Sequence, residues 1–428
     1  MFSTLRNAWK VADLRKKILF TFFIILIYRL GNVIPVPFVD TTALQQAFDA
    51  QLGNTILGLY NVMSGSAFSQ ATIFALSIQP YINASIIIQL LTIAIPALER
   101  LSKDGGEEGK KKIERITRWT TVGLGLLMGF AYYMMLDRTF TGILSENGFL
   151  PALVIVLSFT AGASLVMWLG EQITEFGIGN GISIILFANI VSRLPSGVIS
   201  MGTQLVNNFG HYWYVALITL VAMIAMMVFI VFITQSERRI PVSYAKRVVG
   251  RKVYGGQNTT LPIKVNMTGV LPIIFAQSIC SLPATIATFC GMSQENGWYK
   301  YVFNNTSAVY CVFYFLLIIG FSYFYATIQY NPVEIANNLK KNGGFIPGFR
   351  PGKPTSDFIR KVINKITLFG ALYLAVVAIA PVIAGAILGS NTISIGGTSV
   401  IIVVGVALET VAAMEAQMLM RHYKGFLE

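Results

Sequence analysis

The feature that most constrains this fold is a series of long apolar runs with almost no charge. A membrane-spanning helix needs about 20 mainly apolar residues. Ten such runs cover residues 18–35, 73–97, 116–136, 151–170, 181–199, 212–234, 268–289, 308–330, 366–388 and 398–418. Charged residues make up only 12% of the chain, whereas soluble domains average about 25%. The sequence therefore predicts an all-α polytopic membrane protein with ten transmembrane helices.

The positions of Lys and Arg indicate how these helices are oriented. An even number of spans places both termini, residues 1–17 and 419–428, on the same side of the membrane. Of the 32 Lys and Arg residues, all but Arg29, Arg138, Arg193 and Lys300 lie in or beside the segments on that side. Because loops rich in Lys and Arg stay in the cytoplasm, we expect both termini to be cytoplasmic. The same bias accounts for most of the net charge of +13 without a nucleic acid partner.

Two of the expected cytoplasmic loops are too long to be simple connectors. They cover residues 235–266 and 331–365, and loops beyond about 12–15 residues are usually functional or disordered. Both combine aromatic, proline and basic residues, as a docking surface would. Two interpretations stay open at this point: the basic residues bind a cytoplasmic partner, or they only fix the topology.

The ten spans divide into two halves, 18–199 and 212–418, joined by an expected external linker at 200–211. Since five is odd, a repeated half must be inverted in the membrane. Spans two and seven hold equivalent positions and read "IQPYINASIIIQLL" and "GVLPIIFAQSICSLPATI". Both place a proline near the start and polar residues inside an apolar run, and such residues need a partner helix or an aqueous cavity. We therefore expect the two helices to face each other across a central cleft.

The sequence offers little for catalysis, metal binding or ion-coupled transport. The stretch Gly105–Lys112 lacks the first glycine and the Ser or Thr of a phosphate loop. Neither histidine, and none of the three cysteines, has a partner at metal-ligand spacing. The spans are almost free of ionisable residues, which weighs against a proton- or sodium-coupled carrier. We expect no enzyme, no cofactor, no metal and no direct nucleotide binding; a polytopic small-solute transporter and a structural scaffold without a conduit stay open as alternatives.

Five stretches of the chain resemble the SecY family, whose members are the main subunit of the protein-conducting channel. They are residues 75–92, 167–191, 244–276, 331–355 and 395–404, including "ALSIQPYINASIIIQLLT" and "MWLGEQITEFGIGNGISIILFANIV". They occur in order and at matching places in the topology, and the chain looks like a bacterial member. The resemblance implies an hourglass channel of two inverted five-helix halves in the bacterial cytoplasmic membrane. Such a channel passes unfolded secretory polypeptides across the bilayer and releases transmembrane segments sideways into lipid.

The resemblance also places a ring of aliphatic side chains at the waist of the hourglass. By local motif its members are Ile82, Ile86, Leu186, Ile190, Ile274 and Ile402. The leucine at 186 departs from the more usual isoleucine but keeps its bulk. From spacing alone, these residues would be interpreted as helix packing or lipid contacts. An aliphatic ring has nothing to solvate an ion, so it can dewet and resist leakage.

A plug at residues 61–74 is implied in the same way and is expected to close the outer vestibule. Its members include Asn61, Ser64, Gly65, Ser66, Phe68 and Phe74. Many family members have Gly-Gly where this chain has Gly65-Ser66, a difference that bears on the mobility of the plug rather than on its identity. Spans two and three are expected to face spans seven and eight at a lateral gate that opens to lipid.

Partners are implied because the chain has no ATP site of its own. By resemblance, the driving force comes from the SecA motor ATPase for secreted proteins and from the ribosome for membrane proteins. Both are expected to dock on the long basic loops, at Arg251, Lys252 and Arg350. The small subunits SecE and SecG complete the complex, with SecE embracing the two halves. A signal sequence is expected to shift the gate by its own hydrophobicity.

Overall fold

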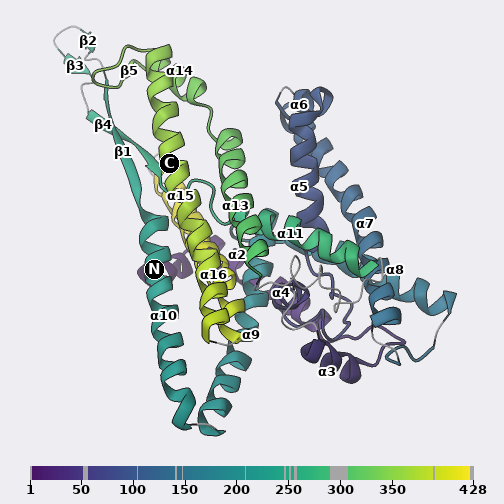
Figure 1. Ribbon diagram of the computed structural model, residues 1–428. Helices are drawn as coiled ribbons and strands as arrows, with labels where there is room; N and C mark the ends of the chain where they lie inside the picture. Colours follow the sequence, from purple (N-terminus) through teal and green to yellow (C-terminus); the bar gives the residue numbers. More distant parts are fainter. Residues whose placement is uncertain are drawn as a thin grey trace.

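Long helices account for most of the molecule (Figure 1). The computed structural model describes residues 2–424 except 52–55, 104, 140–141, 147, 208, 245–246, 250–251, 255–257, 290–306 and 389–390. The helices of the first part of the chain are α1 (Phe2–Lys10), α2 (Ala12–Gly31), α3 (Thr41–Gln51), α4 (Ile56–Met63), α5 (Gln79–Ala94), α6 (Pro96–Lys103), α7 (Gly106–Thr139), α8 (Phe149–Phe176) and α9 (Gly181–Asn207). Those of the second part are α10 (Phe209–Gln235), α11 (Leu271–Phe289), α13 (Ala308–Gln329), α14 (Pro332–Lys341), α15 (Lys353–Leu388) and α16 (Asn391–Lys424).

Each of the ten predicted spans coincides with one helix. In chain order these are α2, α5, α7, α8, α9, α10, α11, α13, α15 and α16. Within the described residues, seven helices are long and apolar enough on their own to cross a membrane, and counting the bent pair α5 and α6 as one span gives eight. The apolar part of α11 that the structure describes is shorter, Leu271–Cys280. The prediction of a helical polytopic membrane protein is confirmed.

Several helix ends differ from the predicted span boundaries, because hydropathy marks only the apolar part of a helix. The predicted span 366–388 begins earlier, at Lys353, and helix ends occupy most of the predicted linker 200–211. The predicted span 73–97 begins later, at Gln79, because residues 73–78 form turns. It ends at Ile95, whose extended backbone (φ −108°, ψ 112°) precedes Pro96. A residue before proline is driven out of the helical conformation, and α6 continues at 106° to α5.

The two long loops form strands that the all-helical prediction did not contain. The strands are β1 (Glu237–Tyr244), β2 (Arg247–Val249), β3 (Lys252–Tyr254), β4 (Asn258–Lys264) and β5 (Gly344–Phe345). β1 pairs antiparallel with β4 of its own loop and with β5 of the other loop, in the order β4-β1-β5. Ile240 and Ile263 of this sheet share a buried cluster with Ile359 and Ile363 of α15. The loops are therefore one folded unit seated on the polar extension of α15.

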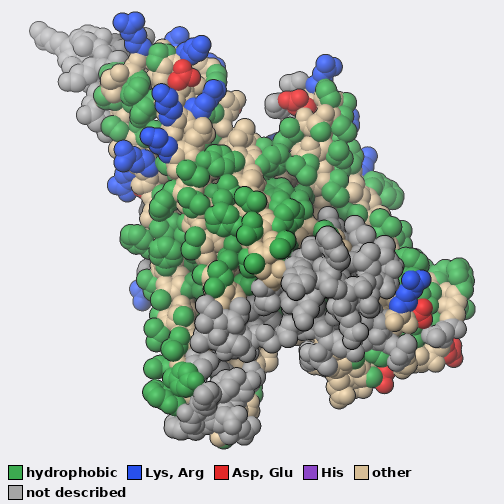
Figure 2. Space-filling view, in the orientation of Figure 1, with side chains coloured by type: hydrophobic (Ala, Val, Ile, Leu, Met, Phe, Trp, Pro, Cys, Tyr) green, Lys and Arg blue, Asp and Glu red, His purple; other side chains and the backbone are tan. Residues whose placement is uncertain are grey.

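The strands, α14 and α6 lie at one end of the molecule, and α3 lies at the other (Figure 1). We call these the loop end and the α3 end. Lys and Arg gather at the loop end, next to a broad hydrophobic surface (Figure 2). On α10, large apolar side chains such as Leu217, Val228 and Phe232 are more than half exposed. This surface suits a chain that is surrounded by lipid.

Candidate functional site

The structure brings all six expected ring residues into one continuous hydrophobic cluster. None is more than 5% exposed. They come from α5 (Ile82 and Ile86), α9 (Leu186 and Ile190), α11 (Ile274) and α16 (Ile402). α11 packs against α4, α5 and α7 of the first half as well as against α13 and α15 of the second. Aliphatic side chains from both halves therefore meet between α5, α9, α11 and α16.

The expected plug, residues 61–74, consists of the last residues of α4 and the turns that follow it, and the surrounding helices bury most of it. Asn61, Ser64, Phe68 and Phe74 are at most 6% exposed, and Gly65 and Ser66 are partly exposed. Its own side chains fold it locally, because Asn61 Oδ1 accepts the amide of Ser69 at 3.0 Å and Ser64 Oγ accepts the amide of Phe68 at 3.1 Å. Polar side chains thus satisfy a non-helical backbone inside an apolar surrounding.

Phe68 fixes one side of this segment in an aromatic cage. Its ring centroid lies 5.6 Å from that of Phe48 on α3, 6.2 Å from Tyr60 on α4 and 4.7 Å from Tyr132 on α7. The hydroxyl of Tyr132 also donates to the carbonyl oxygen of Phe68. A cavity of about 40 Å³ lies beside the ring and is lined by apolar side chains such as Met128. Three helices therefore hold one side chain of the plug.

Phe74 fixes the other side of the plug against α2. Its ring stacks on that of Tyr28 with a centroid distance of 5.4 Å and an interplanar angle of 2°. A Cβ atom at Gly31 would lie 1.9 Å from the Phe74 ring, so this position requires glycine. Ser66, two residues before Phe68, has φ +75°, a left-handed conformation that costs a residue with a Cβ more than it costs glycine. The Gly-Ser sequence thus places some strain at the centre of the plug.

A polar network that sequence reasoning missed joins the plug to the ring helices. Asn189 lies on α9 between two ring positions and is fully buried. Its Nδ2 donates to the carbonyl of Met63 at 2.8 Å, to the hydroxyl of Tyr28 at 2.9 Å and to Ser77 Oγ at 3.3 Å. A single amide inside an apolar run is the sequence signal that could have found it, since such residues are rarely lipid-facing.

Arg29 is a second polar residue beside the plug whose position the sequence did not predict. Its guanidinium comes from the end of α2 and donates through Nη2 to the carbonyl of Ala188 on α9 at 2.5 Å. A Cβ atom on Gly65 would lie 2.9 Å from Nη1 of Arg29. The charge therefore lies directly against the plug backbone, and a charged side chain inside a membrane protein is a candidate functional group.

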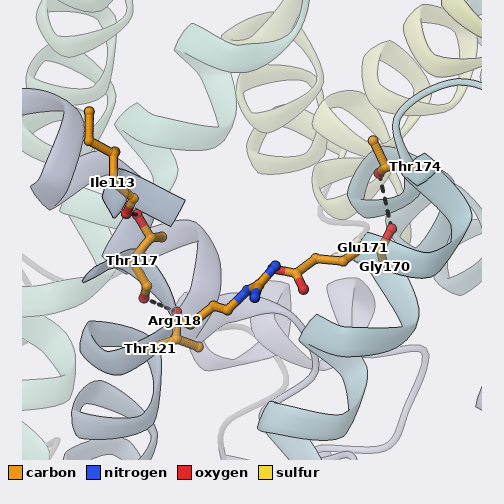
Figure 3. Close-up of polar contacts among 7 residues, drawn as sticks. All are labelled: Ile113, Thr117, Arg118, Thr121, Gly170, Glu171 and Thr174. Atoms are coloured by element: carbon orange, nitrogen blue, oxygen red, sulfur yellow. Dashed lines mark hydrogen bonds and ion pairs between the residues drawn. The ribbon is translucent and has the colours of Figure 1, made fainter. Parts of the chain in front are cut away.

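At the expected lateral gate, the described residues include a hydrogen bond that joins the two halves. The hydroxyl of Tyr325 on α13 donates to Oε1 of Gln89 on α5 at 2.6 Å. Within the second half, the Tyr325 ring packs against that of Phe275 on α11, with the two centroids 5.2 Å apart. Within the first half, by contrast, Arg118 on α7 and Glu171 on α8 form an ion pair of 2.8 Å (Figure 3). This pair helps to keep α7 and α8 together, although partly exposed pairs contribute little stability.

The structure describes the three expected docking residues to different extents. Arg251 lies outside the described residues. Lys252 begins β3, and its side chain is likewise outside the described part of the structure. Arg350 lies on an exposed turn between β5 and α15 at the loop end, where its carbonyl accepts Thr355 Oγ1 at 2.8 Å. The Arg350 side chain is thus placed where a partner could reach it.

Comparison with known proteins identifies the family. A family model described as SecY matches residues 72–411. The chain belongs to the SecY family. It is 44% identical to the protein translocase subunit SecY of Streptomyces scabiei and 43% identical to that of Bacillus subtilis (strain 168), with full coverage of both chains in each case.

Solved structures of channels share this SecY-family fold. One described as "The structure of a protein conducting channel" matches with a TM-score of 0.67 and 16% identity, covering 94% of this chain and 92% of that one. Another, "Sec61 in the Canine ribosome-channel complex from the endoplasmic reticulum", matches with a TM-score of 0.64 and 15% identity over 94% and 92% of the two chains. The ten-helix channel architecture expected from the sequence is confirmed.

Proposed function

We propose that this chain is the pore-forming subunit of a protein translocase, a passive conduit for unfolded polypeptides. The observation that carries the proposal is the buried plug, which is anchored by Phe68 and Phe74 and lies next to a cluster of aliphatic side chains from both halves. Family membership with translocase subunits supports the same function. The relatives that match this chain over its full length are protein translocase subunits. This disfavours the alternative of a small-solute transporter.

The six ring residues seal the conduit by excluding water and ions. Aliphatic side chains provide no ligands for an ion, so a narrow ring of them dewets. The seal matters because each charge that crosses dissipates about 2.3 kcal/mol per 100 mV. The same side chains are non-directional, so they can close around any polypeptide side chain without selecting one. The plug adds a second barrier on the α3 side of the ring.

Lateral release takes place between α5 and the helices α11 and α13, where one hydrogen bond, from Tyr325 to Gln89, joins the two halves. A client segment between them is in contact with both the channel interior and lipid. Centrally placed Leu or Ile favours lipid by about 0.3–0.6 kcal/mol per residue, whereas Lys or Arg costs about 2.5–3.5 kcal/mol. The client therefore selects its own destination by hydrophobicity, and the channel needs no chemistry of its own.

Energy, orientation and assembly complete the proposal. The loop end faces the cytoplasm of a bacterium, with both termini on that side, as the excess of Lys and Arg in its loops indicates. Arg251, Lys252 and Arg350 dock the SecA motor for secreted proteins or the ribosome for membrane proteins. SecE and SecG cover part of the exposed apolar surface of the helices.

Site-specific crosslinking tests the route of the polypeptide. A photo-reactive residue replaces Ile82, Ile190 or Ile402, and a secretory chain is stalled midway by SecA in vesicles. The control carries the same group at Leu217 on α10, which is 55% exposed to the surroundings of the helices. Crosslinks from the ring positions alone support passage through the ring. Equal crosslinking from the control contradicts the ring assignment and reopens the transporter and scaffold alternatives.

A further inference from the structure

A small polar cavity lies where the segment after β4 passes α15 on its way to α11. Its volume is about 10 Å³, and its wall includes Asn266 and Thr268 of that segment and Thr367 and Gly370 of α15. A cavity must offer on the order of 10–15 Å³ to hold one water molecule. The space is therefore suited to a single small polar ligand.

Two polar atoms in this wall are buried without a partner. Asn266 is 9% exposed and Thr367 is 4% exposed, and neither Oδ1 of Asn266 nor Oγ1 of Thr367 has a hydrogen-bond partner among the described residues. A threonine in a helix often donates to the carbonyl of the residue four positions earlier, as Thr410 on α16 does to Val406 at 2.7 Å. Because buried polar groups are paired in the large majority of cases, these two atoms indicate a ligand that supplies the missing hydrogen bonds.

The backbone beside the cavity is held in place by close contacts. The amide of Val265 donates to the carbonyl oxygen of Ser236 at 2.9 Å. A Cβ atom on Gly370 would lie 2.7 Å from the carbonyl oxygen of Val265, so this carbonyl packs directly on α15, and both residues line the cavity. Two residues further on, Met267 is buried in the cluster that joins the sheet to α15. The cavity therefore lies within a packed junction between the folded loop unit and α15.

We propose that this cavity is the binding site of one water molecule, which fastens the entry of α11 to α15. Buried waters make about three hydrogen bonds. A water here donates one hydrogen to Oδ1 of Asn266 and the other to the carbonyl oxygen of Val265, and it accepts the hydroxyl of Thr367. Since α11 begins at Leu271, shortly after Asn266, the water fixes the start of this helix relative to the loop unit. This role is separate from the proposed conduit and does not depend on it.

Amide hydrogen exchange in the full chain with its small subunits, reconstituted in nanodiscs, tests the site through peptides that cover residues 259–276. Local opening governs exchange in such a segment. Thr367→Val keeps the shape of the side chain but removes the hydroxyl, so the water loses a partner and Oδ1 of Asn266 loses its donor. Exchange in these peptides should then rise about five- to tenfold, as expected for one lost hydrogen bond. If the hydroxyl binds no water, the same substitution only removes a buried unpaired group, and exchange that is unchanged or slower overturns the proposal.

A double variant separates a shared ligand from an effect of packing. Asn266→Leu together with Thr367→Val replaces both side-chain partners of the water by apolar groups, so neither is left unpaired. Exchange should be slower than in Thr367→Val alone, and equal or faster exchange overturns the proposal. Thr117→Val is the matched control, because Thr117 is 7% exposed but its hydroxyl already donates to the carbonyl oxygen of Ile113 at 3.0 Å. It should leave exchange at residues 259–276 unchanged, and a rise equal to that of Thr367→Val removes the support for a local site.

A density map of the wild-type complex that resolves ordered waters decides the question directly, even if the variants fail to assemble. A peak within about 3.2 Å of both Oδ1 of Asn266 and Oγ1 of Thr367 supports the proposal. A direct hydrogen bond between these two atoms, or a cavity without a peak, overturns it. Exchange is also compared in sodium and potassium salts at equal ionic strength. A difference confined to residues 259–276 identifies a bound cation in place of water and overturns the assignment.

Discussion

Truncation of Phe68 gives the most quantitative test of how the plug is held. The side chain is 6% exposed and contacts aromatic rings from α3, α4 and α7. Replacing a buried Phe by Ala costs about 3–5 kcal/mol in protein cores. Because a cavity of about 40 Å³ already lies beside the ring, the substitution enlarges an existing void, and we expect a loss of at least about 3 kcal/mol. If the ring leaves its cage when the plug moves, this loss shifts the closed-to-displaced ratio on the order of 100-fold.

The resting ion conductance of the reconstituted channel in planar bilayers measures this shift. Phe68→Ala should increase the fraction of time that the channel conducts without a client, and Phe68→Leu, which keeps apolar volume but lacks the ring, should have an intermediate effect. Phe23→Ala on α2 is the matched control, because it removes the same atoms from a side chain that is 59% exposed. A Phe68→Ala channel that leaks no more than the wild type would refute the reasoning, since the aromatic cage would then contribute nothing to closure.

Four further outcomes follow from the described contacts. Tyr132→Phe removes the hydroxyl that donates to the plug backbone, so the closed state should lose about 1 kcal/mol and the resting leak should rise several-fold; an unchanged leak contradicts the role of that hydrogen bond. Ile86→Asn places an amide in the buried ring and favours a wetted waist, so weaker signal sequences should be accepted; unchanged signal stringency and leak count against the ring assignment. Arg350→Glu at the exposed loop end should abolish SecA-driven transport while the complex stays assembled, and normal transport removes this contact from the docking surface. Hydrogen bonds from the side chain of Thr42 and from the first amides of α3 lower the pKa of Asp40. The ionised Asp40 therefore stabilises α3 above pH about 4, and this stabilisation is lost as the pH falls through the pKa of Asp40 in the folded protein. Amide exchange in α3, corrected for its intrinsic rate, should accelerate as the pH falls through that pKa in the wild type and should be fast at every pH in Asp40→Ala.

The membrane part of the fold could be predicted from the sequence because the bilayer imposes strict conditions. Each crossing needs a long apolar run with an internally bonded backbone, and ten runs gave ten helices. The loops obey weaker conditions. β1 has a strand alternation with Ile240 and Val242 buried, but two inward positions are too few to distinguish a strand from a basic connector. The polar extension of α15 contains Ile359 and Ile363, which are four residues apart and buried together. This spacing indicates a helix, but an average of hydropathy over a window does not detect it.

The candidate site could be predicted only in part. The spacing of Ile82 and Ile86 places them on one helix face, but it does not indicate which residues that face contacts. The six ring residues were therefore predicted from the family resemblance. Its role stays a prediction, although all its members share one buried cluster. The polar residues of spans two and seven indicated that these helices face each other, but not that Gln79 and Gln277 both contact Met63, because the two contacts join residues 16 and 214 positions apart. Such contacts depend on how the two halves pack, which no local period records.

The plug is joined to the chain at both ends, through α4 before it and α5 after it, so a displaced plug stays tethered to its own channel. Its return to the closed position is an intramolecular reaction, for which a short flexible tether supplies an effective concentration in the millimolar range. Closure of a loop of about ten residues takes about 10–100 ns, and it does not depend on how many channels the membrane contains. If a client displaces the plug as the proposed function requires, the time for which the pathway stays unsealed is governed by how long the client occupies it, and each channel reseals without another molecule.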